Sequence, residues 1–239
     1  MKALILNSGT GSRMGELTST KPKCMTDLVT GETILSRQLR QIAETRIIKE
    51  VIITTGLYDD VIREYCNSLN LDLTYHFVKN ELYNKTNYIY SVYLAGNLTE
   101  CDLLFLHGDL VFDSIVLNNI LKQKESYMVV SAIISPLPEK DFKAVIKNGK
   151  IEKIGIEFFD NAVAAQPLYK LNQTDWLIWF SNINKYCETN NTGCYAENAF
   201  NTLEKPFNLF PYDSGELLCS EIDNIDDLAN VNLVLERSY

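Results

Sequence analysis

The sequence predicts an α/β fold with a Rossmann-like, mainly parallel but mixed sheet and a small β-rich lobe. Short apolar runs typical of strands alternate with helix-like stretches through the first half of the chain, which is the spacing of βαβ units. Val51-Ile52-Ile53 is β-branched throughout, as in a strand buried on both faces. The strands are expected at 2–6, 49–54, 73–78 and 102–107, and the helices at 33–45, 58–68 and 87–96.

In the second half of the chain, strand-like runs and helix-like stretches alternate less regularly. Residues 127–135 read as one more buried strand, and Asn148-Gly149 between two apolar runs predicts a β-hairpin over 144–154. We expect a single domain, 1–239, in which 1–135 and 205–239 form a core and 136–204 form the small lobe. The later elements are expected as helices at 174–188 and 195–204, strands at 207–211 and 216–222, and a last helix, 223–237, capped by Asn224.

Composition excludes several classes of protein. The chain has a net charge of −9 and no basic block, so neither nucleic acid nor an anionic membrane is an expected partner. Its six cysteines include no C-x-x-C pair, which favours reduced, buried thiols over a zinc site. The first apolar run is too short for a signal peptide, and no segment approaches the ~18 apolar residues of a membrane span. We expect a cytoplasmic protein, either a monomer or a homodimer.

The first strand runs into a glycine-containing loop, Leu6-Asn7-Ser8-Gly9-Thr10-Gly11-Ser12-Arg13. Gly9 and Gly11 have no Cβ, so backbone N–H groups there can approach phosphate oxygens. Arg13 and Lys23 can balance phosphate charge. The loop is not a Walker A motif, and Met14 replaces the third glycine of a dinucleotide fingerprint. A nucleotide triphosphate site is the prediction.

Two carboxylates stand at strand ends. Asp109 follows the apolar run 103–106, and Asp223 follows Cys219-Ser220-Glu221-Ile222. Because ligands bind at the carboxyl ends of parallel strands, these acids could meet over the loop and hold Mg²⁺, which prefers oxygen ligands. The alternative is that Asp109 and Asp223 simply cap the helices that follow them.

The string LNSGTGSRMGELTSTKPKCM resembles the signature of the sugar-phosphate-type nucleotidyltransferases. The segment 87–94, His107-Gly108-Asp109 and Glu221-Ile222-Asp223 further resemble the bacterial phosphocholine cytidylyltransferase branch. Asn7-Ser8 departs from the usual Ala-Ala, and His107-Gly108 before the acid is a second departure; neither removes a charged group. The resemblance implies catalytic Arg13 and Lys23, Mg²⁺ on Asp109 and Asp223, and nucleotide contacts from Leu6, Asn7, Ser8, Gly9, Gly11, Asn87, Ser91 and Gly108.

A nucleotidyltransferase also binds an acceptor, the molecule to which it transfers the nucleotidyl group. We expect the core, 1–135 and 205–239, to bind the nucleotide and the lobe, 136–204, to bind the acceptor. An acceptor with an ammonium group needs aromatic walls and a carboxylate. Tyr195-Ala196-Glu197-Asn198 loosely resembles a stretch of the phosphocholine branch, so Tyr195 and Glu197 are candidates, together with Phe142. Lys143 favours a carboxylate or phosphonate acceptor, unless it is a solvated strand residue. Phosphocholine, phosphoglutamine and 2-aminoethylphosphonate are therefore all candidate acceptors. Trp176 and Trp179, at i and i+3, are expected in the core.

These observations favour a Mg²⁺-dependent cytidylyltransferase that transfers CMP from CTP to a small phosphorylated or phosphonate acceptor. An acceptor phosphate is already a nucleophile, so positioning and charge neutralisation suffice, and no covalent intermediate is expected. The CDP-activated product would serve the decoration of surface glycans such as capsular polysaccharide. A sugar-1-phosphate nucleotidylyltransferase is the nearest alternative, and a non-catalytic nucleotide-binding regulator or a dinucleotide-dependent oxidoreductase are alternatives of other classes.

Overall fold

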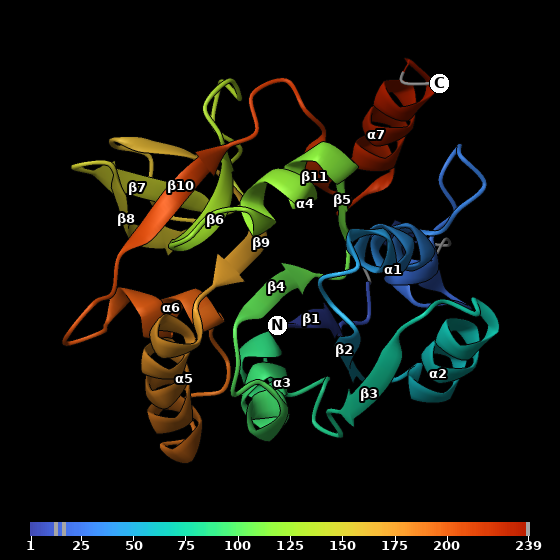
Figure 1. Ribbon diagram of the computed structural model, residues 1–239, viewed down its shortest axis with the longest axis horizontal. Coiled ribbons are helices and arrows are strands. Elements are labelled where there is room, and N and C mark those ends of the chain that lie inside the picture. The colour runs from blue at the N-terminus through green and yellow to red at the C-terminus, as the bar shows by residue number, and fades with distance from the viewer. Residues whose placement is uncertain (12–13, 16–17, 238–239) are drawn as a thin grey trace.

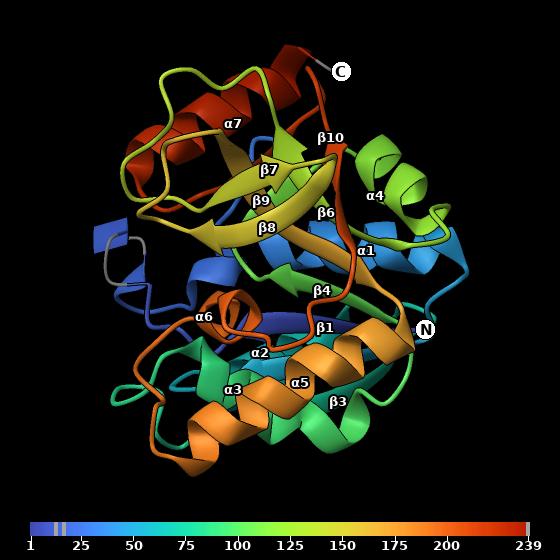
Figure 2. The same ribbon diagram turned by 90° about the vertical axis from the view of Figure 1, so that its left-hand side faces the viewer.

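The computed structural model describes residues 1–11, 14–15 and 18–237. A central sheet runs through the molecule, with helices on both of its faces (Figures 1 and 2). Its strands lie in the order β10 (Leu209–Asp213), β6 (Ser126–Ser131), β9 (Ala162–Leu171), β4 (Leu103–His107), β1 (Lys2–Asn7), β2 (Glu50–Thr55) and β3 (Thr74–Lys79). Along this order β4, β1, β2 and β3 are parallel to one another, and β10 is parallel to β6. Of these seven strands, only β9 is antiparallel to both strands beside it. The predicted mainly parallel, mixed sheet is confirmed.

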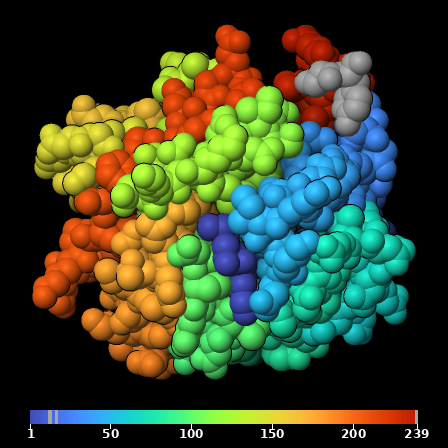
Figure 3. Space-filling view, viewed as in Figure 1, coloured from blue at the N-terminus to red at the C-terminus, as the bar shows by residue number. Residues whose placement is uncertain are grey.

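The helices cover the two faces of the sheet because successive strand residues point to opposite sides. In β1, Ala3 and Ile5 belong to one core cluster, with helices α1 (Ile34–Thr45), α2 (Asp59–Ser68) and α4 (Ser114–Leu121). Leu4 belongs to the other cluster, with α3 (Tyr88–Ala95), α5 (Gln173–Glu188) and α6 (Ala196–Asn201). α1, α4 and α5 form much of the face seen in Figure 3. Trp176 and Trp179 of α5 are fully buried, as predicted.

The strand β9 was not predicted. Its sequence, AVAAQPLYKL, is rich in alanine and contains Pro167, which has no N–H for a ladder hydrogen bond. The pairing of β6 with β9 shifts register here: Met128 pairs with Tyr169, and the next residue, Val129, pairs with Gln166. This irregularity accommodates a proline within an interior strand.

The hairpin predicted at Asn148-Gly149 is present as β7 (Lys143–Lys147) and β8 (Lys150–Gly155). Asn148 has a φ of 51° and Gly149 a φ of 73°, the positive values that a tight two-residue hairpin turn requires. β7 also pairs with β9, so the hairpin is attached to the central sheet. The predicted division into a core and a lobe at 136–204 stays a prediction, but β9 and α5 of that stretch lie in the central layers.

A second, two-stranded sheet joins β5 (Leu110–Phe112) to β11 (Cys219–Glu221), antiparallel. The last helix, α7 (Ile225–Arg237), follows it and packs Val231 and Leu235 into a third, smaller core cluster. Asn224 caps this helix, because its Oδ1 accepts hydrogen bonds from the backbone N–H groups of Asp226 and Asp227. This small sheet brings the two predicted acidic positions together across more than a hundred residues.

Two further expectations concern the state of the cysteines and the presence of membrane-spanning helices. All six cysteines are free, and Cys24, Cys66, Cys187 and Cys219 are buried. Within the described ranges, no helix combines the length and the apolar character needed to cross a bilayer.

Candidate active site

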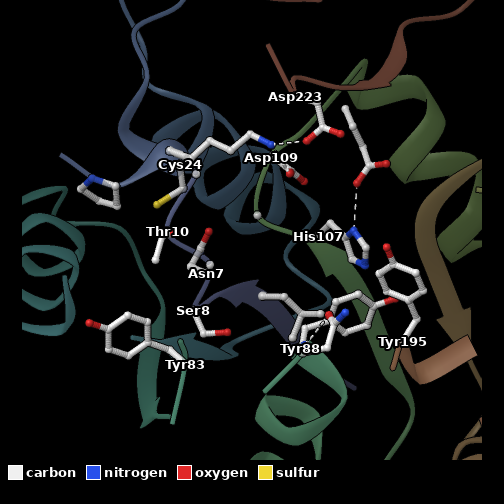
Figure 4. A pocket seen from close by; sticks show the side chains of 18 of the residues that line it. Asn7, Ser8, Thr10, Cys24, Tyr83, Tyr88, His107, Asp109, Tyr195 and Asp223 are labelled. Atoms are coloured by element: carbon white, nitrogen blue, oxygen red, sulfur yellow. Dashed lines mark hydrogen bonds and ion pairs between the residues drawn. The ribbon is translucent and has the colours of Figure 1, made fainter. Parts of the chain in front are cut away.

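A cavity of about 580 Å³ opens at the carboxyl ends of β1 and β4. In open parallel sheets this edge is where ligands bind. Figure 4 shows three groups of side chains around it: Asp109 and Asp223 on one side, Asn7, Ser8 and Tyr83 on another, and His107, Tyr88 and Tyr195 on the third. Of the predicted site residues, Leu6, Asn7, Ser8, Gly9, Gly11, Lys23, Asn87, Gly108, Asp109, Phe142, Tyr195 and Asp223 line the cavity.

The glycines of the loop have different roles. Gly11 has a φ of +67°, and a Cβ there would lie 2.9 Å from Cβ of Lys23, so both the backbone conformation and the close packing require glycine. Thr18 Oγ1 donates to the Gly11 carbonyl at 2.9 Å and holds the loop. Gly9 has no positive φ, and a Cβ there would meet no atom within 4 Å. Gly9 therefore leaves its backbone uncovered beside the cavity. Arg13 lies outside the described residues.

Lys23 lies between the two acids. It begins the 3-10 helix η2 (Lys23–Met25), and its Nζ is 2.6 Å from Asp109 Oδ2 and 2.6 Å from Asp223 Oδ1. The side chains of all three residues are at most 20% exposed. Burial alone would lower the pKa of Lys23, but the two carboxylates outweigh it and hold this pKa above its ordinary value. The site thus has one cation and two anions in direct contact.

The small sheet positions the acids. Glu221 of β11 pairs with Leu110 of β5, and the Ile222 N–H donates to the Asp109 carbonyl at 3.0 Å. Gln38 of α1 holds the turn from behind, since its Nε2 donates to the carbonyls of His107 (3.0 Å) and Leu110 (2.7 Å). The alternative of helix caps does not describe the two acids: the residue that precedes α4 is Asp113, and α7 is capped by Asn224.

The residues present fit a divalent metal ion. Asp109 Oδ1 is buried and has no hydrogen-bond partner among the residues described, which leaves a carboxylate oxygen unsatisfied. Two carboxylates from separate strands are the oxygen donors that Mg²⁺ prefers. Glu221 was not predicted as a site residue, yet it also lines the cavity. Ligand atoms of His107, Asp109 and Glu221 lie within 4.8 Å of one another. The signal that could have found Glu221 is its i, i+2 spacing to Asp223 at the end of an extended segment, which directs both side chains to the same side.

His107 and Glu221 form a pair beside these acids, with Nδ1 and Oε1 2.8 Å apart. Burial alone would lower the pKa of His107, but the hydrogen bond and charge of Glu221 raise it to about 9. Burial, with the charge of Asp109, also raises the pKa of Glu221. The pair therefore favours retaining a proton on His107. His76 has a similar local partner, Glu50, at 3.0 Å.

Some of the residues predicted to bind the nucleotide line the cavity, and others lie behind its wall. Ser8, Asn7 and Asn87 lie on the cavity wall. Ser91, predicted to line the site, is fully buried behind it and contacts Ser8, with the two hydroxyl oxygens 2.7 Å apart. Gly108 lies against Asn7, since a Cβ at position 108 would be 1.7 Å from Asn7 Oδ1.

Aromatic rings form the third wall. Phe142 and Tyr195 meet edge-to-face with ring centroids 5.0 Å apart, and Tyr88 lies 5.7 Å from Tyr195. His107 contacts Tyr88 at 4.9 Å and so connects this wall to the acids. Tyr88 was not predicted as a site residue, because an aromatic residue at the start of an apolar helix is indistinguishable from a core residue in sequence.

Glu197 lies beneath this wall and not on it. Its residue is 1% exposed, and its carboxylate accepts hydrogen bonds from the hydroxyls of Tyr88 and Tyr169, the latter at 2.8 Å. The predicted direct contact between Glu197 and an acceptor is therefore absent from this arrangement. Its negative charge instead acts from behind the Tyr88 ring, which faces the cavity.

The structure does not place Lys143 at the cavity. Phe142 lines the cavity, and the next residue of an extended chain points to the opposite side. Lys143 is fully buried there; its Nζ donates to the carbonyls of Pro138 (2.6 Å) and Glu139 (3.2 Å). Two lysines that were not predicted, Lys85 and Lys140, line the cavity instead.

Comparison with known proteins agrees with this geometry. The model of the MobA-like NTP transferase domain matches residues 3–138, more than half of the chain. The chain belongs to this family. The resemblance to the nucleotidyltransferases that the sequence motifs predicted is thereby confirmed.

Three relatives of this MobA-like protein share about the same identity. The CMP-5'-(3-aminopropyl)phosphonate synthase of Streptomyces rubellomurinus is 28% identical over 67% of this chain and 25% of its own length. The CTP:phosphoglutamine cytidylyltransferase of Campylobacter jejuni is 28% identical over 54% and 52%, and the choline-phosphate cytidylyltransferase of Haemophilus influenzae is 30% identical over 65% and 63%. The chain thus spans between a quarter and somewhat under two thirds of these relatives.

Solved structures show the same fold at lower identity. The CTP:phosphocholine cytidylyltransferase of Streptococcus pneumoniae superimposes with a TM-score of 0.80 at 18% identity, over 98% of both chains. The inositol-1-phosphate CTP transferase of T. maritima gives 0.79 at 19% identity, over 98% of this chain and 94% of that one. The predicted fold class is confirmed.

Proposed function

We propose that this protein is a Mg²⁺-dependent cytidylyltransferase that transfers CMP from CTP to a small phosphorylated or phosphonate acceptor. The observation that carries the proposal is the contact of Lys23 with both Asp109 and Asp223, at 2.6 Å each, in a cavity that begins with an uncovered glycine loop. A cation beside a pair of carboxylates in a cavity supplies the groups that phosphoryl chemistry requires. A non-catalytic nucleotide-binding protein would not need the acid pair.

The reaction follows from the charges in the site. An oxygen of the acceptor phosphate or phosphonate attacks the α-phosphorus of CTP, and the bond to the β-phosphate oxygen breaks as pyrophosphate leaves. The nucleophile is already an anion, so no side chain has to remove a proton. The barrier comes from repulsion between anions and from alignment, and Lys23 lowers it by neutralising charge on the transferred phosphate. No covalent intermediate on the protein is needed.

Asp109 and Asp223 would hold the magnesium ion, which supplies further neutralisation of phosphate charge when bound. Because Lys23 contacts both carboxylates, its ammonium has to share or leave these contacts when an ion takes them. Lys23 lines the same cavity as Gly9 and Gly11, so its ammonium could contact phosphates bound at the glycine loop. Lys23 would then serve two anionic partners in turn.

CTP as the donor and the class of acceptor are inferred from the relatives and from the walls. The three curated relatives are named for CMP or CTP chemistry on a phosphonate, on phosphoglutamine and on choline phosphate. The rings of Tyr88, Phe142 and Tyr195, with the Glu197 carboxylate behind them, suit the ammonium group that acceptors of this kind carry. Use of the CDP-activated product in surface glycan decoration stays a prediction.

Pyrophosphate release tests the proposal. Each of CTP, UTP, ATP and GTP is supplied with phosphocholine, phosphoglutamine, 2-aminoethylphosphonate or a hexose 1-phosphate, with magnesium and with a chelator. We expect release with CTP and one of the first three acceptors, and none with the chelator. Asp223→Asn should abolish it, while Asp226→Asn, an exposed residue of the next helix, should not. Turnover only with a hexose 1-phosphate would support the sugar-nucleotide alternative, and no turnover with any pair would contradict the proposal.

A further inference from the structure

Ser8 ends a chain of buried hydrogen bonds whose direction the structure determines. Ser8 lines the cavity, whereas Ser91 and Asn80 behind it are at most 1% exposed. Ser8 Oγ is 2.7 Å from Ser91 Oγ, and Ser91 Oγ is 3.0 Å from Asn80 Nδ2. Distances alone do not tell which serine donates to the other, but the partners of Asn80 do.

The Asn80 amide has one possible orientation. Its Oδ1 accepts from the backbone N–H of Leu82 at 2.8 Å, so the other side-chain atom is the NH₂ group. That group donates to Ser91 Oγ and to Thr86 Oγ1 at 3.1 Å. Thr86 can accept because its own hydroxyl proton goes to the Leu82 carbonyl at 2.9 Å. Each proton in this part of the network has an assigned acceptor.

Ser91 must then donate to Ser8. Ser91 Oγ already accepts from Asn80, and among the residues described its remaining neighbour is Ser8 Oγ. A fully buried hydroxyl that left its proton unpaired would be unfavourable, because it would lose its hydrogen bond to water and gain none in return. With the Ser91 proton directed to Ser8, the Ser8 oxygen has accepted one hydrogen bond and its own O–H is left to donate. Ser8 therefore presents a donor to the cavity.

The Ser8 side of the cavity is where a nucleobase fits, on the basis of the proposed function. Tyr83 lies on the same side as Ser8 and offers a ring face, while Tyr88 and Tyr195 lie on the other side, where the Glu197 carboxylate is bound to the Tyr88 hydroxyl (Figure 4). Asn87 also lines the cavity and carries an amide. Ser8 is also the residue before the uncovered Gly9, so a nucleotide whose phosphates lie along the loop toward Lys23 has its base near Ser8.

We propose that Ser8 is a specificity-determining residue that donates its hydroxyl hydrogen bond to N3 of cytosine. Cytosine has a lone pair at N3, whereas uracil has an N–H there, so a donor held in place by Ser91 pairs with one base and opposes the other. O2 is an acceptor in both bases and cannot distinguish them. Asn7-Ser8 is one of the departures of this chain from the usual Ala-Ala, and alanine could not supply this donor.

Nucleotide binding measures the effect without any knowledge of the acceptor. Dissociation constants for CTP, UTP and 3-deaza-CTP, which lacks the N3 lone pair, are obtained by calorimetry with magnesium present. We expect Ser8→Ala to weaken CTP about ten-fold with little change for UTP, so that the CTP preference falls about ten-fold. Ser91→Ala, which does not touch the cavity, should reduce the preference as well, because Ser8 can then accept as readily as it donates.

Thr10→Ala is the matched control, since Thr10 lines the cavity in the same loop but lies outside the network. It should leave the ratio of CTP to UTP affinity unchanged. In the unmodified protein, 3-deaza-CTP should bind about ten-fold more weakly than CTP, and in Ser8→Ala the two should bind alike. An unchanged preference in both serine variants, or equal binding of CTP and 3-deaza-CTP to the unmodified protein, would overturn the assignment of Ser8. Absence of any nucleotide binding would instead contradict the proposed function.

Discussion

Gly108 lies so close to Asn7 that the two residues fit only because one has no side chain. A Cβ at position 108 would be 1.7 Å from Asn7 Oδ1 and 2.5 Å from the Leu6 carbonyl. The Gly108 N–H also donates to that carbonyl at 3.0 Å, so the backbone of the Asp109 turn is bound directly to the end of β1. The contact joins the loop that is predicted to hold the nucleotide to the turn that carries a predicted metal ligand.

Gly108→Ala should therefore disturb both ends of the site. The methyl group must displace Asn7 or move the turn, and overpacking of this kind costs about 1–3 kcal/mol in the free energy of unfolding. We expect a lower Tm by thermal denaturation together with a fall in kcat/KM for CTP. Gly193→Ala is the control, because Gly193 also lines the cavity but a Cβ there meets no atom within 4 Å. Equal Tm values for the two variants would contradict the close packing.

Lys23→Ala should lower catalysis and strengthen metal binding at once. Loss of a positioned cation at the transferred phosphate is expected to reduce kcat by about 10²–10³. Without nucleotide, however, the variant removes the ammonium that lies 2.6 Å from each of Asp109 and Asp223, so this cation no longer competes with a metal ion for the two carboxylates. We expect Mn²⁺, titrated by electron paramagnetic resonance, to bind the free variant about ten-fold more tightly. Lys21→Ala, which removes only an exposed pair with Asp27, should change neither quantity. Weaker Mn²⁺ binding in Lys23→Ala would show that Lys23 does not compete with the metal.

Much of the fold could be predicted because its signals are local. Apolar runs such as 49–54 and the Asn148-Gly149 turn determine a buried strand and a hairpin within a few residues. β9 could not be predicted in this way. Its alanines and Pro167 oppose a strand locally, and only the neighbours β4 and β6, which are distant in sequence, make it one.

The same distinction applies to the site. The placement of Asp109 beside the loop follows from a general property of parallel sheets, so it could be expected from its strand-end position. Asp223 was expected there by the same rule, but it follows β11 of the separate antiparallel sheet, and the pairing of β11 with β5 brings it to Lys23. The side of a strand to which one residue points depends on the phase of the whole strand, which is why Lys143 was expected in the cavity that Phe142 lines. The roles of Lys23, Asp109 and Asp223 in binding and catalysis stay predictions.

Glu197→Gln should weaken the acceptor and not the nucleotide. The carboxylate accepts from the Tyr88 and Tyr169 hydroxyls, and an amide can accept at only one of its two ends, so one tyrosine hydroxyl loses the acceptor for its proton. The charge behind the Tyr88 ring is lost as well. We expect the KM of an ammonium-bearing acceptor to rise about ten-fold, with the KM of CTP within two-fold of its normal value.

A neutral acceptor separates the charge of Glu197 from its packing. With 3,3-dimethylbutyl phosphate, in which carbon replaces the nitrogen of phosphocholine, the same variant should show little change in KM. Glu188→Gln, at the exposed end of α5, serves as the control for loss of charge alone. Equal effects on the charged and neutral acceptors would indicate a purely structural role.

Lys140 and Lys143 provide a last pair of opposed predictions, because they are three residues apart and lie on different sides of the same segment. Lys140 lines the cavity, whereas the Lys143 ammonium is bound to the carbonyls of Pro138 and Glu139. Lys140→Met should therefore lower turnover of a carboxylate-bearing acceptor several-fold relative to phosphocholine, as expected when a cation is lost from the wall. Lys143→Met should leave that ratio within about two-fold and instead speed amide hydrogen exchange over 138–142, whose anchor it removes. If Lys143→Met changed the acceptor ratio and Lys140→Met did not, the two lysines would have the reverse of the places described here.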